Sequence, residues 1–142
     1  MMSQVLPYKS KYGEGYIFDS SFQVFKSIND ENRRCTPSET EVNLAELILK
    51  QQLKSLNKNK VNQFNNCPVI NKRLHKYFRQ YVGFINNSGE KVIWINFFWN
   101  KNLIKQAKEN IIEVNDGCSY YWNIEVNIDK GMASHLKVNG AG

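Results

Sequence analysis

The chain lacks several features that mark particular protein classes. No apolar run approaches the roughly 18 residues of a transmembrane helix, so we expect no membrane span. Its three cysteines, Cys35, Cys67 and Cys118, are too few for a disulfide framework, and none lies in a Cys-x-x-Cys or Cys/His zinc motif. Either one bridge with a free thiol or three reduced thiols fits this count, and we favour reduced thiols.

Recognisable catalytic patterns are also absent. The only histidines, His75 and His135, have no motif linking them to a cysteine nucleophile. Gly13-Glu14-Gly15 does not connect a strand to a helix in the way a phosphate-binding loop does. The carboxylates show no spacing that selects a catalytic or metal-binding set. We therefore predict no catalytic residue, no metal site and no cofactor.

What the chain does contain is typical of a soluble globular domain. Its 142 residues are 42% hydrophobic and 13% aromatic, which is enough apolar material for one core. Nineteen basic against thirteen acidic residues give a net charge of +6, with no long run of like charge. We expect a single domain over residues 1–142.

One long helix is predicted over residues 37–57. Thr36 is expected to be its N-cap, with Pro37 at the first helical position and Glu39 completing a capping box. Apolar residues then recur at three- and four-residue steps, namely Val42, Ala45, Leu49, Leu53 and Leu56.

A β-hairpin is predicted from residues 77–85 and 91–99, which alternate with period two. An even-numbered turn would place Phe78, Val82, Ile93 and Trp99 on a core face and Trp94 on the other face. A three-residue loop ending at Gly89 would instead pair odd-numbered residues with odd-numbered residues. The sequence leaves both registers open.

A second hairpin is predicted from residues 111–114 and 120–128, followed by a last strand over 132–138. The fold class is thus α+β, with one long helix packed on an antiparallel β-meander of about four strands. Cystatin-like and NTF2-like domains share this architecture, an analogy that carries no function. Residues 1–35, with a short strand at 16–18, form a candidate covering segment for the second sheet face.

The non-core sheet face of the first register is the predicted recognition surface. It combines large amphipathic rings with amides and charges, the composition of an interface. Its members are Tyr77, Arg79, Tyr81, Trp94, Asn96, Tyr121, Asn123, Glu125 and Asn127. We predict a non-enzymatic domain that binds an unidentified protein or small ligand there, or that forms a homodimer through the sheet. If residues 1–35 cover this face, its aromatic residues instead form a second core.

Two rival functions remain. In a small NTF2-like pocket enzyme, His75, Arg79 or Glu125 would line a cone between helix and sheet. In a weak binder of single-stranded nucleic acid, Lys72, Arg73, Lys76 and Arg79 would provide the basic cluster. The modest net charge and the absence of an RNA-recognition motif argue against nucleic acid.

Parts of the second half of the chain resemble a group of small, exported, uncharacterised proteins of Bacteroidota-type bacteria. The similarity lies in residues 77–83, 89–96 and 138–141, in Asp116-Gly117, and in Asn123 and Asn127. It implies an exported, periplasmic fragment with its signal peptide absent, and a cytoplasmic location is the alternative. The cystatin motif Gln-x-Val-x-Gly is not reproduced by Gln80-Tyr81-Val82-Gly83, so we expect no protease inhibition by that route.

Overall fold

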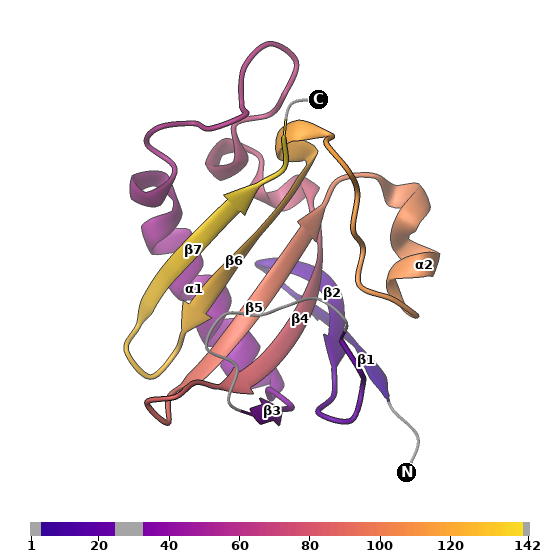
Figure 1. Ribbon diagram of the computed structural model, residues 1–142, viewed down its shortest axis with the longest axis vertical. Coiled ribbons are helices and arrows are strands. Elements are labelled where there is room, and N and C mark those ends of the chain that lie inside the picture. Colours follow the sequence, from indigo (N-terminus) through magenta and orange to yellow (C-terminus); the bar gives the residue numbers. More distant parts are fainter. Residues whose placement is uncertain (1–3, 25–32, 141–142) are drawn as a thin grey trace.

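The computed structural model describes residues 4–24 and 33–140 and shows an α+β fold (Figure 1). A seven-stranded mixed sheet carries the long helix α1 (Glu39–Leu56) on one face. The strands are β1 (Val5–Ser10), β2 (Gly13–Phe18), β3 (Arg33–Cys35), β4 (Phe78–Ile85), β5 (Lys91–Phe98), β6 (Tyr121–Asn127) and β7 (Met132–Val138).

The sheet is larger than the four-stranded meander predicted, and it is not wholly antiparallel. Its order is β1-β2-β4-β5-β6-β7, and β2 runs parallel to β4. The short β3 pairs with the remaining length of the same β4 edge. The N-terminal strands therefore extend the sheet, a pairing that no local sequence pattern predicts because the partners are far apart in the chain.

Helix α1 confirms the predicted long helix but begins later than expected. Its N-cap is Ser38, whose side chain accepts a hydrogen bond from the backbone N–H of Glu41 while the Glu41 carboxylate accepts one from the backbone of Ser38. Thr36 was the wrong cap, because its hydroxyl instead accepts a hydrogen bond from the backbone N–H of Ser20. Four residues of the predicted apolar stripe, Val42, Ala45, Leu49 and Leu53, are buried against the sheet, whereas the fifth, Leu56, is 41% exposed.

The β4–β5 hairpin adopts the second of the two predicted registers. Asn86 pairs with Glu90 across a three-residue loop that ends at Gly89, where φ is +78° and glycine is favoured. Odd-numbered residues therefore face odd-numbered ones, as in the pair Tyr81 and Ile95 on the α1 face. The even-numbered set, including Trp94, faces away from α1.

A second core covers much of the sheet face opposite α1. Phe18, Val82, Phe84, Val92 and Trp94 form one buried cluster there. The short helix α2 (Ile104–Ala107) and residues 108–114 cross the same face beside Phe78 and Phe98. Residues 1–35 were predicted as a possible cover for this sheet face. In the described part of that segment, Phe18, Phe22 and Val24 belong to the same cluster as Trp94, so the segment contributes to the second core.

The predicted strand over 111–114 was wrong, because this segment crosses the sheet without joining it. Strand β6 pairs with β5 and β7 instead, and β7 confirms the predicted last strand.

The prediction of three reduced thiols was wrong, because the structure contains one disulfide bridge and one free cysteine. Cys67 and Cys118 form a disulfide that ties the loop after α1 to the short 3₁₀ helix η4 (Cys118–Tyr120), whereas Cys35 is free. Within residues 4–24 and 33–140, no helix is both long and apolar enough to cross a membrane.

Candidate functional site

The nine residues of the predicted recognition surface do not share one face. Tyr77, Arg79 and Tyr81 lie under α1, whereas the other six lie on the opposite face of the sheet. The cause is the three-residue hairpin loop, which reverses the assignment of β4 relative to β5. The predicted surface is therefore divided between two separate regions of the molecule.

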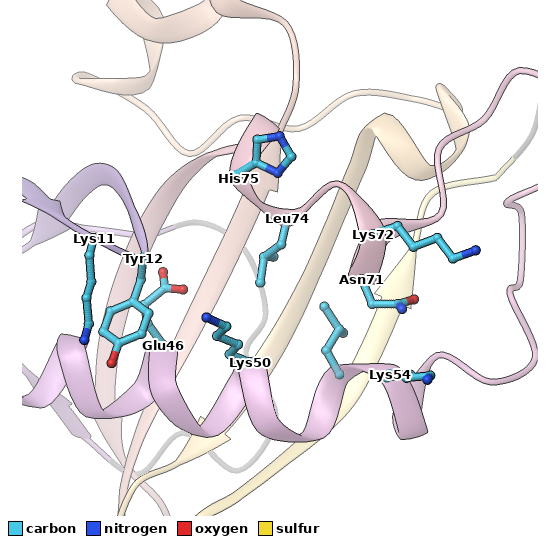
Figure 2. Close-up of a pocket in the computed structure, with 10 residues that line it drawn as sticks. Lys11, Tyr12, Glu46, Lys50, Lys54, Asn71, Lys72, Leu74 and His75 are labelled. Atoms are coloured by element: carbon cyan, nitrogen blue, oxygen red, sulfur yellow. The ribbon is translucent and has the colours of Figure 1, made fainter.

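The three residues proposed for the enzyme alternative, His75, Arg79 and Glu125, do not lie around one pocket. His75 is exposed and lines a cleft of about 460 Å³ between α1 and the 3₁₀ helices η1 (Ile70–Lys72) and η2 (Leu74–Lys76) (Figure 2). Glu125 lies on the other face of the sheet, where its carboxylate is 3.6 Å from the ring Nδ1 of His135. These groups face different regions and cannot act on one substrate.

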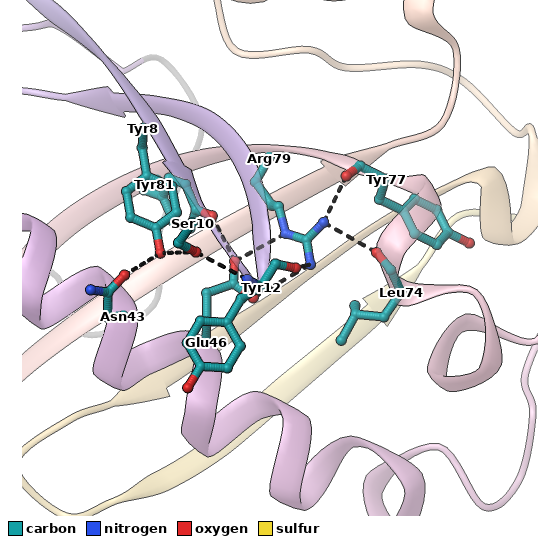
Figure 3. Close-up of polar contacts among 9 residues, drawn as sticks. All are labelled: Tyr8, Ser10, Tyr12, Asn43, Glu46, Leu74, Tyr77, Arg79 and Tyr81. Atoms are coloured by element: carbon teal, nitrogen blue, oxygen red, sulfur yellow. Dashed lines mark hydrogen bonds and ion pairs between the residues drawn. The ribbon is translucent and has the colours of Figure 1, made fainter.

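Arg79, the third member of that grouping, is fully buried and fully hydrogen-bonded (Figure 3). Its Nε and Nη2 donate to the Glu46 carboxylate, at 3.0 and 3.4 Å. Its remaining N–H groups donate to the backbone oxygens of Tyr12, Leu74 and Tyr77, at 3.1, 3.1 and 2.7 Å. All five donors of the guanidinium are used, so none remains for a ligand.

The two tyrosines beside Arg79 are likewise part of the core. The Tyr81 hydroxyl donates to Glu46 at 2.6 Å, and burial, reinforced by the Glu46 charge, raises the pKa of Tyr81 well above its ordinary value. The Tyr77 hydroxyl donates to the backbone oxygen of Ser119, and burial raises its pKa too. Both phenols are held neutral as hydrogen-bond donors inside the protein.

A row of three amides crosses the face opposite α1. Gln80, Asn96 and Asn123 occupy paired positions on β4, β5 and β6. Gln80 is wholly buried, and its side chain donates to the backbone oxygens of Ala107 and Asn110. Its amide oxygen accepts from the Asn96 side chain and from the backbone N–H of Ile112, at 3.0 and 2.9 Å. This row fixes the 107–112 segment over the sheet.

The open end of this row lies in a polar hollow of about 280 Å³, which we call the amide pocket. Asn96 and Asn123 are 6% and 8% exposed. The Asn123 oxygen accepts from Trp94 Nε1 at 3.2 Å, and the Asn96 nitrogen donates to the backbone oxygen of Ile112. Among the described residues, the Asn96 Oδ1 and Asn123 Nδ2 atoms have no protein partner.

Side chains and backbone from four segments line the amide pocket. They are Asn96, Phe97, Ile112, Glu113, Val114, Asn115, Tyr121, Asn123 and Asn139. Asn139 holds the C-terminal segment against residues 114–116 by donating to the backbone oxygens of Val114 and Asp116, at 2.6 and 2.7 Å. Three of the nine predicted site residues, Asn96, Tyr121 and Asn123, thus lie together here.

The other predicted residues on this face have structural contacts. Trp94 is buried in the second core. Asn127 donates to the Glu90 carboxylate and accepts from the backbone N–H of Lys130, so it orders the two neighbouring turns.

Two polar residues with central positions, Gln80 and Glu46, were not predicted as such from the sequence. Glu46 is a buried carboxylate on the apolar face of α1, and Gln80 is a polar residue within an apolar strand. A polar residue interrupting a hydrophobic pattern was the available signal in both cases. Across residues 4–24 and 33–140, no group of three or more His, Cys, Asp or Glu side chains is placed to hold a metal ion.

No protein family, curated protein or solved structure matches the chain. The similarity to exported Bacteroidota-type proteins therefore stays a prediction.

Proposed function

We propose that this chain is a non-enzymatic binding domain that takes an uncharged polar ligand in the amide pocket. One observation carries the proposal: Asn96 and Asn123 lie side by side, each more than nine-tenths buried, and each has an amide atom without a protein partner. Within the described residues, the one side-chain N or O atom that is both buried and unpartnered is Trp122 Nε1. The two amide atoms instead open into the hollow, where a ligand can take the place of water.

The pocket selects for a ligand by hydrogen-bond pattern. Asn96 offers an acceptor and Asn123 offers donors, at neighbouring positions of adjacent strands. Hydroxyl and secondary amide groups present a donor and an acceptor close together, and Tyr121 adds a ring at the side of the hollow. These features favour a hydroxyl-rich or amide-rich ligand, such as a neutral saccharide.

An exported location forms part of the proposal. The Cys67–Cys118 bridge supports it, because structural disulfides persist in oxidising compartments and are rare in a reducing cytosol. A bacterial, periplasmic setting rests on the resemblance alone, and the cystatin-like or NTF2-like arrangement rests on the common theme of one long helix across a sheet.

The homodimer alternative predicts a different use of the sheet. The β7 edge has no further strand partner among the described residues, so a second copy would add to the sheet there. Light scattering over a range of protein concentrations separates this alternative from the monomeric binding domain.

The test uses ¹⁵N-labelled protein titrated with neutral oligosaccharides that carry N-acetyl groups and, separately, with blocked dipeptide amides. We expect saturable shifts of the Asn96 and Asn123 side-chain amides with one of these probes. Asn123→Asp keeps the oxygen that accepts from Trp94 but removes the free donor, and should weaken binding about 10-fold or more. Asn102→Asp makes the same charge change at an exposed position of the short 3₁₀ helix η3 (Lys101–Leu103) and is the matched control.

Equal affinity for the wild type and Asn123→Asp would contradict the proposed site. Absence of saturable binding by both probe classes would contradict the proposed ligand class.

A further inference from the structure

A second hollow, on the α1 side of the sheet, is independent of the amide pocket. One wall is α1, the other is formed by η1 and η2, and the β1–β2 turn bounds one end (Figure 2). The lining residues are Lys11, Tyr12, Glu46, Lys50, Leu53, Lys54, Asn71, Lys72, Leu74 and His75. We call it the lysine cleft, and its volume of about 460 Å³ is in the range of small-molecule sites.

The lysine cleft carries positive charge that the protein does not neutralise. Lys11, Lys50, Lys54 and Lys72 are exposed, and none forms an ion pair within the described part of the chain. The one acidic side chain in the lining, Glu46, is already paired with the buried Arg79 at 3.0 Å. Four unpaired ammonium groups around one concave space produce a local field that attracts anions.

Two further side chains of the lining, Asn71 and His75, add hydrogen-bond donors to those of the lysines. The Asn71 oxygen accepts from the Asn57 side chain at 2.9 Å, which leaves the Asn71 amide N–H groups available. His75 is exposed on the same wall and adds a ring nitrogen donor. The cleft therefore presents mainly donors, and it suits a ligand that consists mainly of acceptors.

Arg79 fixes the shape of the cleft from beneath. Its guanidinium binds Glu46 of α1, the Tyr12 oxygen in the β1–β2 turn and the Leu74 oxygen in η2, so one side chain joins all three boundaries (Figure 3). At the other end, Asn57 at the end of α1 donates to Asn71 in η1. Walls held in this way lose little freedom when a ligand binds.

We propose that the lysine cleft binds a small organic phosphate. Its phosphate would be held by the ammonium groups, chiefly Lys50 on α1 and Lys72 on η1. Its organic part would contact Leu74 and the edge of the Tyr12 ring, because Lys11 Nζ lies over the ring face, 5.3 Å from its centroid. A phosphate monoester matches this site because it concentrates nearly two negative charges and three acceptor oxygens in one group. Lysine provides mobile point charges for such a group, whereas bidentate carboxylate recognition favours arginine.

The test measures binding by ¹⁵N chemical-shift titration at low ionic strength, with adenosine monophosphate, inorganic phosphate, citrate and a ten-nucleotide single-stranded DNA as probes. We expect adenosine monophosphate to bind most tightly, with shifts concentrated in α1 and residues 70–76. Lys50→Glu and Lys72→Glu should each weaken binding more than 10-fold. Lys105→Glu, an exposed lysine of α2 on the opposite side of the sheet, makes the same charge change and should alter binding less than 2-fold.

A fourth variant distinguishes binding inside the lysine cleft from nonspecific attraction of an anion to surface charge. Leu74→Trp fills the hollow without changing the net charge and should also weaken adenosine monophosphate binding, with folding checked by circular dichroism and by unchanged spectra in the amide pocket. Equal losses for Lys105→Glu and Lys50→Glu would overturn the proposal, as would preferential binding of citrate or DNA. Absence of saturable binding by adenosine monophosphate would overturn it as well. The Asn123→Asp variant tests the amide pocket on the other face of the sheet, so either proposal can fail without affecting the other.

Discussion

Arg79 shows why residue type alone does not identify a binding residue. On a strand that also carries Tyr77 and Tyr81, an arginine is typical of an interface. In the fold, its five donors are used within the protein, and its ring contact is with Phe97, 5.0 Å from the guanidinium carbon. Its effect on binding is therefore indirect, through the shape of the lysine cleft.

Arg79→Met should destabilise the protein by about 3–5 kcal/mol, because it leaves the Glu46 carboxylate buried without its partner. Urea unfolding measures the loss. The double variant Arg79→Met with Glu46→Leu removes both charges and should recover a large part of it. A loss below about 1 kcal/mol for Arg79→Met would mean that water or a neighbouring group compensates the carboxylate.

Trp94→Ala should cost more stability than Trp99→Ala. Trp94 is 3% exposed within the second core, so its truncation leaves a cavity worth about 3–5 kcal/mol. Trp99 is half-buried at the edge of the α1-side core, against Tyr77 and Tyr120. An even-numbered β4–β5 turn would place Trp99 in the core and Trp94 on the other face, and would therefore predict the larger loss for Trp99→Ala. Denaturant unfolding of both variants distinguishes the two registers. Similar losses would contradict this difference in burial.

The individual elements were more predictable than their pairing. The apolar period of α1 and the alternation in residues 77–85, 91–99 and 120–128 located the long helix and three central strands, because these signals are local. The register depended on one loop, since a one-residue change in its length exchanges the faces of a whole strand. For this reason the predicted surface combined Asn96, Tyr121 and Asn123, which lie on one face of the sheet, with Tyr77, Arg79 and Tyr81, which lie on the other. The lysine cleft joins three distant segments, and no linear pattern marks it.

Ser38→Ala should destabilise the protein by about 0.5–2 kcal/mol, because the N-terminus of α1 loses its side-chain acceptor. Thermal unfolding of this variant beside Thr36→Ala separates the observed cap from the one expected by sequence. Thr36 binds the Ser20 backbone outside the helix, so its variant reports on that contact alone. An unchanged melting temperature for Ser38→Ala would show that water satisfies the helix end equally well.

Glu41 should make part of the stability depend on acid pH. Burial acts to raise its pKa, but hydrogen bonds with Lys91 and Ser38 outweigh burial and hold the pKa below its ordinary value. A carboxyl whose pKa is lower in the folded state stabilises the fold above its unfolded pKa. This contribution is lost as the pH falls below about 4.5 and through the folded pKa.

The measurement is urea unfolding of the wild type and Glu41→Gln at several pH values. The wild type should be the more stable near neutral pH, and the difference between the two should shrink in acid. A difference that is constant with pH would exclude the Glu41 charge as its source.

At the scale of the whole molecule, covalent and polar contacts hold the segment from residue 57 to 77 against the turn before β6. The Cys67–Cys118 bridge joins positions 51 residues apart. Nearby, the Tyr120 hydroxyl donates to the backbone oxygen of Asn66, and the Ser119 hydroxyl donates to that of Pro68. The bridge therefore anchors the long irregular segment that leads into η1 and η2.

Replacing Cys67 and Cys118 with serine should lower the free energy of unfolding by about 2–4 kcal/mol, because the unfolded chain regains the freedom of a long loop. Differential scanning calorimetry in the presence and absence of a reducing agent measures the same effect in the wild type. Cys35→Ser is the control, since Cys35 is not bridged. A melting temperature of the wild type that is insensitive to reductant would contradict a stabilising bridge.

The parallel pairing of β2 with β4 has a consequence for the order in which the chain folds. The β1–β2 hairpin is synthesised before its partner strand β4, which begins only at Phe78, the residue that pairs with Glu14. Contacts between such distant residues form slowly because a long loop must close. Until β4 appears, the Ile17 and Phe18 side chains have no sheet to pack on, and a two-stranded hairpin is marginally stable in water. The β1–β2 hairpin is thus made well before the strand on which it docks, and it cannot join the sheet until β4 has been synthesised.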